Sequence, residues 1–516
     1  MADTEKTTSR PPSPLHRDDK VVPPQTNASS DSSNDEGIYV VDWEGPTDPA
    51  NPKNWPVRKK WAITVVVSAY TLLSPLSSAM MAPAGDIIAA QFGVTNSSVS
   101  ALLTSIFVLG YVFGPLLLGP LSEVYGRARV LQAANFWYLA WNFGCAFAQN
   151  IGEMLVFRLL AGLGGSGTLT IGGGVLGDVW TAEQRGQAVS LYSLMPILGP
   201  VIGPLCGAWI AQLGDWRWVF WAPTIFSVAV QLVGLWFLKE SDSDCPSAYA
   251  PVLLERKAAA IRKKNDLEGG CHKEIKTTYY DPHKSWKTFV NKSLFRPFAM
   301  FFREPIIQVM AAYMSLLYGT LYLYLTTIPS IFQGLYRQPI GISGLHYIAF
   351  GIGLAVAAQV NARAIDRVYK YLCQRNDGVG KPEFRLPCMV PGTFLLPIGL
   401  LITGWTSRSD IPWIAPDIGI ALVGAGMVLN LQTIQTYLID AFTLYAASAL
   451  AAATFFRSLA GFGFPLFAPA MFSSLGYGKG DTVLAAVAIV VGILRAPFLF
   501  WKYGERLRNA SRYAKR

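Results

Sequence analysis

The sequence predicts an all-α polytopic membrane protein with twelve transmembrane helices arranged as two six-helix halves. Charged residues make up only 15% of the 516 residues and hydrophobic residues 52%, whereas a soluble chain carries about 25% charged residues. Long apolar runs follow one another, and a charged stretch near the middle separates six runs from six. Helices are expected rather than strands, because the runs exceed barrel-strand length and lipid leaves backbone polar groups without partners.

An α-helix needs about 20 apolar residues to cross the hydrocarbon layer of a membrane. By that rule, the predicted helices span residues 61–83, 98–118, 130–148, 153–176, 188–212, 218–238, 305–330, 339–362, 386–404, 412–438, 445–473 and 482–501. The stretch between the sixth and seventh helices contains no such run. Its residues 252–264 have the spacing of an amphipathic helix that lies on a membrane surface.

These helices divide the chain into five segments. Residues 1–58 are polar and rich in Pro, Ser and Asp, so we expect a disordered cytosolic tail. Residues 59–238 form the N-terminal six-helix half, 239–300 a cytosolic linker, 301–502 the C-terminal six-helix half, and 503–516 a basic cytosolic tail.

The basic residues predict the orientation in the membrane, because cytoplasmic loops carry an excess of Lys and Arg. One side carries Arg127, Arg129, Arg185 and the basic residues of 239–303, 363–385 and 502–516, whereas the other carries in its loops only Arg217, Arg337, Arg408 and Lys479. Both termini are therefore expected in the cytosol. Asn96 opens an Asn-Ser-Ser sequon on the outer side, close to a helix, and its glycosylation stays open.

The turn at residues 119–129, GPLSEVYGRAR, lies between two apolar runs. Gly119 is expected to allow close helix approach and Gly126 a sharp turn, and Glu123 is expected to pair with Arg127 or to cap the N-terminus of a neighbouring helix. The turn, with Arg129, resembles the loop between helices 2 and 3 of the major facilitator superfamily. There the loop is a latch whose ion pairs hold one access state, and the resemblance implies the same fold and role. The alternative is a generic basic cytosolic turn.

A second motif lies in the fifth helix, at Gly199, Gly203, Pro204 and Gly207. Glycines four residues apart share one face and permit close packing, and the proline bends the helix. The run resembles the helix 5 motif that antiporters of this superfamily carry. The alternative is an ordinary glycine packing seam.

Three ionisable residues lie inside apolar runs: Arg158, His346 and Arg457. An unpaired cation in lipid costs a few kcal/mol, so each arginine is expected to face a cavity or a partner. Arg158 stands in a run resembling the family's helix 4 motif, which implies proton coupling, and His346 could titrate near neutral pH. The alternatives are arginines bonded to backbone carbonyls and a packed histidine. No acid is expected deep in a run; those near helix ends are Asp86, Glu153, Asp178, Asp440 and Asp481.

Several longer stretches resemble the fungal twelve-spanning drug:proton antiporters of the same superfamily. They are residues 48–55, 177–188, 214–221, 382–387 and 437–467. The resemblance implies proton-driven export of drugs, polyamines or secondary metabolites, and we expect Asp178, Arg185, Asp366 and Asp440 to act as cytoplasmic gate partners.

The sequence thus favours a monomeric proton-coupled exporter of small organic molecules in the plasma membrane, with the vacuolar membrane as the alternative location. Two arginines and no deep acid favour neutral, aromatic or weakly acidic substrates. A proton-coupled importer of a nutrient or organic acid and a polyamine exporter stay open. An enzyme is not expected, because only four histidines exist and three lie outside the apolar runs. We expect no cofactor, no metal and no nucleic-acid partner; the partners are substrate, protons and lipid.

Overall fold

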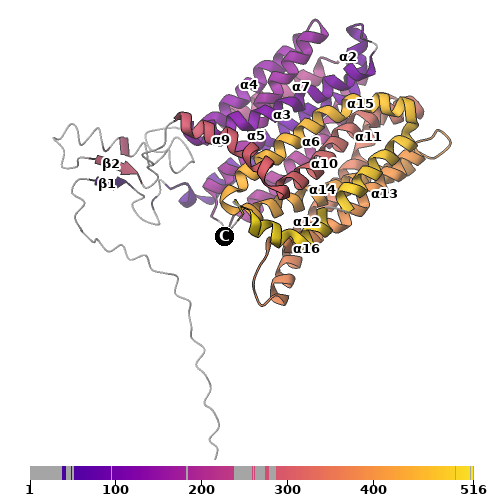
Figure 1. Ribbon diagram of the computed structural model, residues 1–516. Helices are drawn as coiled ribbons and strands as arrows, with labels where there is room; N and C mark the ends of the chain where they lie inside the picture. Colours follow the sequence, from indigo (N-terminus) through magenta and orange to yellow (C-terminus); the bar gives the residue numbers. More distant parts are fainter. Residues whose placement is uncertain are drawn as a thin grey trace, which may run out of the picture.

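The structure is a computed structural model. It describes residues 38–41, 48, 51–94, 96–181, 184–237, 258–259, 261, 274–277, 286–493, 496–511 and 513–514. Most of the predicted N-terminal tail, the linker and its amphipathic segment at 252–264 therefore lie outside the described residues. Long helices cross the molecule side by side in one bundle (Figure 1).

The N-terminal half consists of α1 (Val57–Met80), α2 (Gly85–Gln91), α3 (Ser97–Tyr125), α4 (Arg127–Phe147), α5 (Ile151–Val179), α6 (Arg185–Leu213) and α7 (Trp218–Phe237). The C-terminal half consists of α9 (Trp286–Arg303), α10 (Pro305–Pro329), α11 (Ile340–Leu345), α12 (Tyr347–Arg375), α13 (Val390–Thr406), α14 (Ile414–Phe442), α15 (Ala446–Ala488) and α16 (Ala496–Ala510). Short 3-10 or π turns η1 (Pro52–Asn54), η2 (Ala82–Ala84), η3 (Ser330–Leu335), η4 (Pro382–Met389), η5 (Thr443–Tyr445) and η6 (Ile489–Ile493) join or flank them.

The all-α polytopic fold is confirmed. Ten helical segments of the described chain are long and apolar enough to cross a membrane. One of them, residues 446–492, holds both the eleventh predicted helix and the start of the twelfth, because the two helices meet directly at a kink at Gly476. That residue has φ 73° and ψ 167°, a conformation that favours glycine and marks the bend. The third predicted helix, α4, is absent from the ten because Gln132, Asn135 and Asn142 lower its hydropathy.

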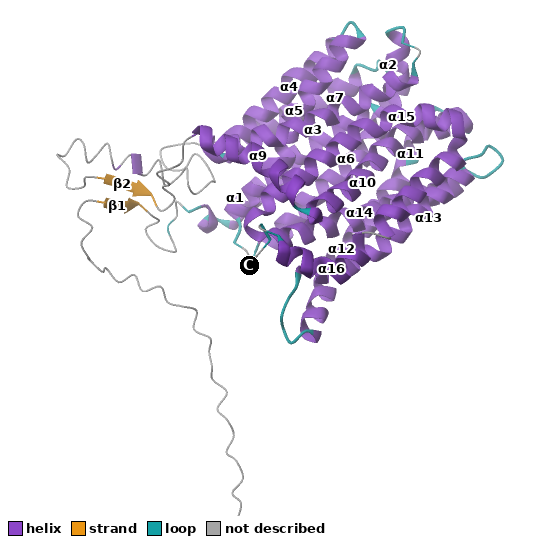
Figure 2. Cartoon of the chain, in the orientation of Figure 1, coloured by secondary structure: helices purple, strands orange, loops and turns teal. Residues whose placement is uncertain are grey.

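Two regular elements depart from the expectations for the tail and linker. The strands β1 (Ile38–Val41) and β2 (Glu274–Thr277) pair in parallel outside the bundle, with Ile38 opposite Glu274 (Figure 2). Helix α9 precedes α10 and packs on α15, where Phe301 stacks on Phe456 at 3.8 Å between ring centres. The requirement for about 20 apolar residues does not predict α9, because charged residues interrupt its apolar ones.

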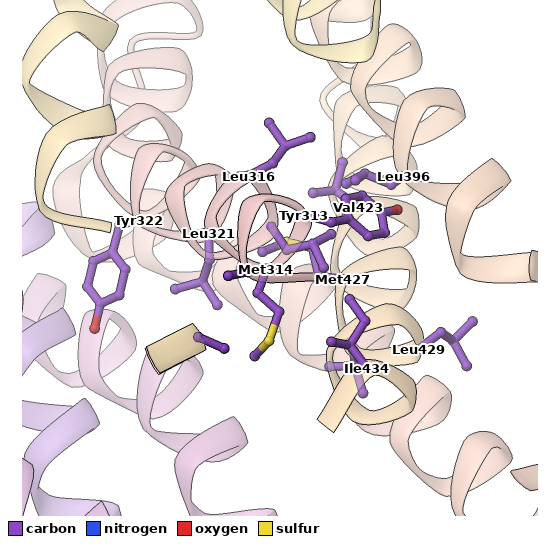
Figure 3. Close-up of a cluster of buried hydrophobic side chains, with 14 of the residues drawn as sticks. Tyr313, Met314, Leu316, Leu321, Tyr322, Leu396, Val423, Met427, Leu429 and Ile434 are labelled. Atoms are coloured by element: carbon purple, nitrogen blue, oxygen red, sulfur yellow. The ribbon is translucent and has the colours of Figure 1, made fainter. Parts of the chain in front are cut away.

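The bundle has two ends, named here by their helices. At the α16 end, α1 and α10 begin and α3, α5 and α14 finish; α2 marks the opposite end (Figure 1). The C-terminal half has a core in which α10 meets α13 and α14, with Tyr313 beside Val423 and Leu396 (Figure 3). Tyr322 points away from that core, on the side of the N-terminal helices (Figure 3).

In the N-terminal half, α6 packs closely against α1 along the glycines of the helix 5 motif. A Cβ at Gly199, Gly203 or Gly207 would lie 2.6 Å from Pro75 Cβ, 2.5 Å from Leu76 O or 2.2 Å from Met80 O, respectively. Only glycine fits at such distances, which explains the four-residue spacing.

The opposite face of α6 meets the C-terminal half. Here the glycines belong to α11 and α12: a Cβ at Gly344 would lie 2.5 Å from Ala208 Cβ, and one at Gly351 would lie 2.5 Å from Val201 Cγ1. Gly341 N–H donates to Gln212 Oε1 at 2.5 Å. The two halves are thus in close contact beside α11, at the α2 end.

Candidate functional site

A clasp closes the turn between α3 and α4 at the α16 end. Gly126 has φ 93° and ψ 143°, which permits the predicted sharp turn. Arg127 Nε lies 2.6 Å from Asp178 Oδ2 on α5, with side chains 20% and 19% exposed. Gly174 makes room for the guanidinium, since a Cβ there would lie 1.8 Å from Arg127 Nη1. We call Arg127, Gly174 and Asp178 the N-clasp.

Four residues expected to act at this end of the bundle do not take part in the N-clasp. Glu123 is exposed at the end of α3 and pairs with no basic residue of the described chain, and Arg129 is also exposed. A Cβ at Gly119 would meet only Thr170 Cγ2 at 3.8 Å, so the tight helix contact is instead at Gly110 and Gly114, earlier on α3. Arg185, expected as a partner of Asp178, is exposed while Arg127 takes that carboxylate.

The C-terminal half has a matching clasp built on η4. Arg385 Nη1 lies 2.7 Å from Asp366 Oδ1 on α12, and Arg385 Nε lies 2.9 Å from Asp440 Oδ2 on α14. We call Arg385, Asp366 and Asp440 the C-clasp. The two acids are predicted gate partners, whereas their arginine was missed because it lies in a loop 19 residues from one acid and 55 from the other.

The same turn η4 anchors the C-terminal helix. Arg508 on α16 donates from Nε to Glu383 Oε1 at 3.1 Å, and Lys381 donates from Nζ to Glu505 Oε2 at 2.8 Å. That hydrogen bond and the charge of Lys381 lower the pKa of the Glu505 carboxyl. The sequence PEFRLP at residues 382–387 therefore supplies both an arginine for the C-clasp and an acid for α16.

Arg158 on α5 is fully buried and bonded to carbonyl groups. Its Nη1 and Nη2 donate to Ser77 O and Ser78 O at 3.2 and 3.3 Å, and its Nε donates to Leu103 O at 3.1 Å. The two serine carbonyls belong to the last turn of α1, where helix carbonyls lack helical donors and the helix dipole favours a cation. The geometry favours the alternative in which Arg158 is a structural residue.

Arg457 on α15 has a different environment. Its guanidinium carbon lies 5.0 Å from the ring centre of Tyr318 on α10, a cation–π contact. Its Nε is buried and has no hydrogen-bond partner in the described part of the chain. The carbonyl-bonded alternative therefore does not describe Arg457, and the cation has binding capacity that the protein does not use.

Tyrosines and serines from both halves lie next to this arginine. Tyr318 contacts Tyr322 with 5.3 Å between ring centres. The Tyr322 hydroxyl lies 3.2 Å from Ser78 Oγ on α1, and that of Tyr111 on α3 lies 2.7 Å from Ser74 Oγ, one turn away. We name this set the tyrosine–arginine cluster: Ser74, Ser78, Tyr111, Tyr318, Tyr322 and Arg457. It joins α1 and α3 of one half to α10 and α15 of the other.

A pocket of about 300 Å³ lies between the same helices, toward the α2 end. Its lining mixes hydroxyl groups with apolar side chains and includes Asp86, Ser100, Thr327 and Tyr477. Asp86 Oδ1 accepts a hydrogen bond from Ser100 Oγ at 2.6 Å, so the predicted helix-end acid is in this pocket. Pocket and cluster lie along one interface between the halves.

His346 lies at the α2 end, between α11 and α12, and not in the tyrosine–arginine cluster. Its Nδ1 lies 2.8 Å from Asp417 Oδ2 on α14 and its Nε2 lies 2.8 Å from Gln338 Oε1. Its ring stacks on Phe332 at 3.4 Å. A histidine with both nitrogens bonded and a stacked ring matches the alternative of a packed residue.

Two acids near helix ends are nevertheless buried. Asp417, in the first turn of α14, is 9% exposed, and Asp481, shortly after the bend at Gly476, is 1% exposed. Asp417 is not among the helix-end acids expected from the sequence. Asn96 is exposed and caps α3, accepting a hydrogen bond from Ser98 N–H at 2.9 Å. The described residues contain no group of three His, Cys, Asp or Glu that could hold a metal ion.

Comparison with known proteins defines the class of protein. The family model of the Major Facilitator Superfamily matches residues 67–465, and the chain belongs to this family of membrane transporters. It is 43% identical over 476 residues to efflux pump vrtL of Penicillium aethiopicum, covering 92% of this chain and 91% of that protein. It is 41% identical over 474 residues to MFS transporter cpaT of Aspergillus oryzae, covering 92% of each.

Solved structures agree on the fold. The xylose transporter XylE of E. coli, in a partially occluded inward-open conformation, superposes with a TM-score of 0.63 at 15% identity, covering 86% of this chain and 98% of that one. At this identity the likeness speaks for the fold alone. The family membership and the sequence relatives, which are named transporters and efflux pumps, show that the chain is a transporter and not an enzyme.

Proposed function

We propose that this transporter exports small, aromatic-rich, neutral or weakly acidic organic molecules in exchange for protons. The observation that carries the proposal is the tyrosine–arginine cluster, an uncompensated cation among aromatic hydroxyls where the two halves meet. Tyrosine offers stacking area with a polar tip, and arginine attracts anionic groups and rings. The names of the similar efflux pumps support the outward direction.

The orientation follows from the charges at the two ends. Arg127, Arg185, Arg385 and α16 share one end of the bundle, which we assign to the cytosol with both termini. We place the protein, as a monomer, in the plasma membrane. The cluster then receives substrate from the cytosol, the pocket beside Asp86 lies toward the outside, and the two clasps lie at the cytosolic face.

Alternating access would come from rocking of the two halves about the cluster. The α6–α11 contact lies at the outer end, and the N-clasp and C-clasp tie helices together within each half at the cytosolic end. The N-clasp would hold the α3–α4 turn on α5, and the C-clasp would hold α12 beside α14, while the interface between the halves opens and closes. This extends the predicted latch of the helix 2–3 turn to both halves.

The proposal is tested by accumulation in yeast that lacks its own drug pumps. The panel contains rhodamine 6G as a cation, fluconazole as a neutral compound and 2,4-dichlorophenoxyacetic acid as a weak acid, each with and without a protonophore. We expect lower accumulation of the neutral and acidic compounds, and loss of this effect with the protonophore. Raised accumulation would establish import, and an effect restricted to rhodamine 6G would contradict the substrate class.

Arg457→Met tests whether the cluster binds substrate. We expect it to reach the membrane in normal amount and to lose export of the acidic compound most strongly. Arg363→Met is the matched control, because Arg363 is an exposed arginine on α12 whose Nη1 donates only to Gln359 O within its own helix. Equal export by Arg457→Met and wild type would remove the cluster from the transport path.

A further inference from the structure

Asp481 is a buried carboxylate on α15, beyond the bend at Gly476. It is 1% exposed. Its Oδ2 accepts a hydrogen bond from the Tyr324 hydroxyl on α10 at 3.1 Å, and its Oδ1 is buried without any partner in the described residues. On the facing helix α13, Gly404 leaves space for it, since a Cβ there would lie 2.6 Å from Asp481 Cβ.

The groups that face Asp481 provide no counter-charge. From α10 the ionisable group is the Tyr324 hydroxyl, from α15 itself it is the Tyr477 hydroxyl, and α13 presents Gly404 and the neutral Thr403. Lys479, two residues away, is exposed, and no described cation lies within ion-pair distance of the carboxylate. A charged carboxylate with one hydrogen bond and no cation is costly inside a membrane protein, whereas its protonated form is not.

The carboxyl group is connected to both the outer pocket and the interface between the halves. Tyr477, four residues before Asp481 and therefore adjacent on the helix, lines the pocket at the α2 end. On α10, Tyr324 bonds Asp481 while Tyr322, two residues earlier and on the other side of the helix, contacts Ser78 of the N-terminal half. Helix α10 therefore contacts Asp481 on one side and the N-terminal half on the other.

We infer that Asp481 is a proton-binding site of this transporter, loaded from the α2 end and coupled through Tyr324 and α10 to the movement of the two halves. The inference rests on the proposed proton exchange and assigns its proton to a residue. The carboxylate takes one proton from the pocket side and forms a neutral carboxyl group. The same proton leaves when a rearranged α10 exposes the group to the cytosolic side.

Infrared difference spectroscopy of the purified transporter tests proton binding without any substrate. Between acidic and alkaline buffer, we expect a carbonyl band of a protonated carboxyl group that Asp481→Asn removes. Tyr324→Phe is expected to shift the band, because the hydroxyl that bonds the carboxylate is gone. Asp417→Asn, at the other buried acid of this half, should retain it. A band unchanged in Asp481→Asn would overturn the inference.

Transport by the transporter in liposomes separates this inference from the proposed function. The probe is a radiolabelled compound from the yeast panel, the one whose accumulation the wild-type transporter lowers most. We expect Asp481→Asn to keep exchange of this probe at equal pH and to lose accumulation driven by a pH gradient. Gradient-driven accumulation equal to wild type would overturn the role of Asp481. If the wild-type transporter shows no gradient-driven accumulation, that result contradicts proton exchange itself. The infrared band then still decides whether Asp481 binds a proton.

Discussion

The buried charged residues of the two halves differ in how many of their polar atoms are hydrogen-bonded. In the N-terminal half, Arg158 is fully buried and its guanidinium bonds three backbone carbonyls. In the C-terminal half, Arg457 and Asp481 each keep a buried polar atom that no described residue bonds. Because an unsatisfied buried polar group costs about 1–3 kcal/mol, such groups persist where a ligand or a proton gives them a partner. The comparison therefore separates Arg158, whose bonds hold helices of the N-terminal half together, from Arg457 and Asp481, which keep capacity for a ligand or a proton.

The clasps show what the halves share. At the α16 end of each half, an arginine pairs with an acid at the end of that half's fourth membrane-spanning helix. Arg127 pairs with Asp178 at the end of α5, and Arg385 pairs with Asp440 at the end of α14. The similarity between the two halves is therefore retained at the ends of the helices and lost in their buried interior. Asp366 gives the C-clasp a second ion pair, whereas its counterpart Glu123 pairs with no basic residue of the described chain, so the C-clasp is expected to be the firmer of the two.

Removal of Arg158 should have the largest effect. Arg158→Met leaves the carbonyls of Ser77, Ser78 and Leu103 without the arginine, at a cost of about 1–3 kcal/mol each. We expect little folded protein, measured as the monodisperse fraction after solubilisation and as thermal stability. Arg457→Met is the matched comparison in the other half and should retain wild-type stability. Equal stability losses in the two variants would remove the distinction between the halves.

Loss of either clasp should leave folded protein that does not transport. The arginines of both clasps are partly exposed, so Arg127→Ala and Arg385→Ala are each expected to cost no more than about 1 kcal/mol of stability. Transport should nevertheless fall at least about tenfold in both, measured as the rate of probe export at equal surface amount. Arg363→Ala serves as the exposed control. A fully active Arg385→Ala would mean that only the helix 2–3 turn acts as a latch.

Gly203→Ala should have an intermediate effect, on stability rather than on mechanism. The added Cβ would lie 2.5 Å from Leu76 O, and overpacking of this kind costs about 1–3 kcal/mol. We expect a lower melting temperature and export reduced only in proportion to folded protein. Gly463→Ala on α15 is the control, because nothing lies within 4 Å of a Cβ there. A stable but inactive Gly203→Ala would favour a specific antiporter role for the helix 5 motif over a packing seam.

Hydropathy predicted the helices because each must satisfy its own backbone in lipid, a property that depends only on local sequence. The clasps were half predicted: the acids stood out at helix ends, but Arg385 and Gly174 are recognised only when distant segments meet. The burial of Asp481 could not be predicted from the sequence for a related reason. The sequence GYGKGD looks like a loop, yet a single residue, Gly476, makes the bend and the helix resumes at once. Whether a charged residue is buried depends on the helices that pack around it. The sequence of a single apolar run does not identify those helices.

Replacement of His346 should have the smallest effect, and it sharpens the contrast with Asp481. Both residues are buried in the C-terminal half, but His346 has partners on both nitrogens and a stacked ring, whereas Asp481 has an unpartnered oxygen. His346→Gln removes the contact with Asp417 and is expected to cost about 1 kcal/mol of stability. Export and its pH dependence should match wild type, measured across a series of external pH values. A flattened profile would contradict the assignment to Asp481 and would indicate that the His346–Asp417 pair binds the transported proton instead.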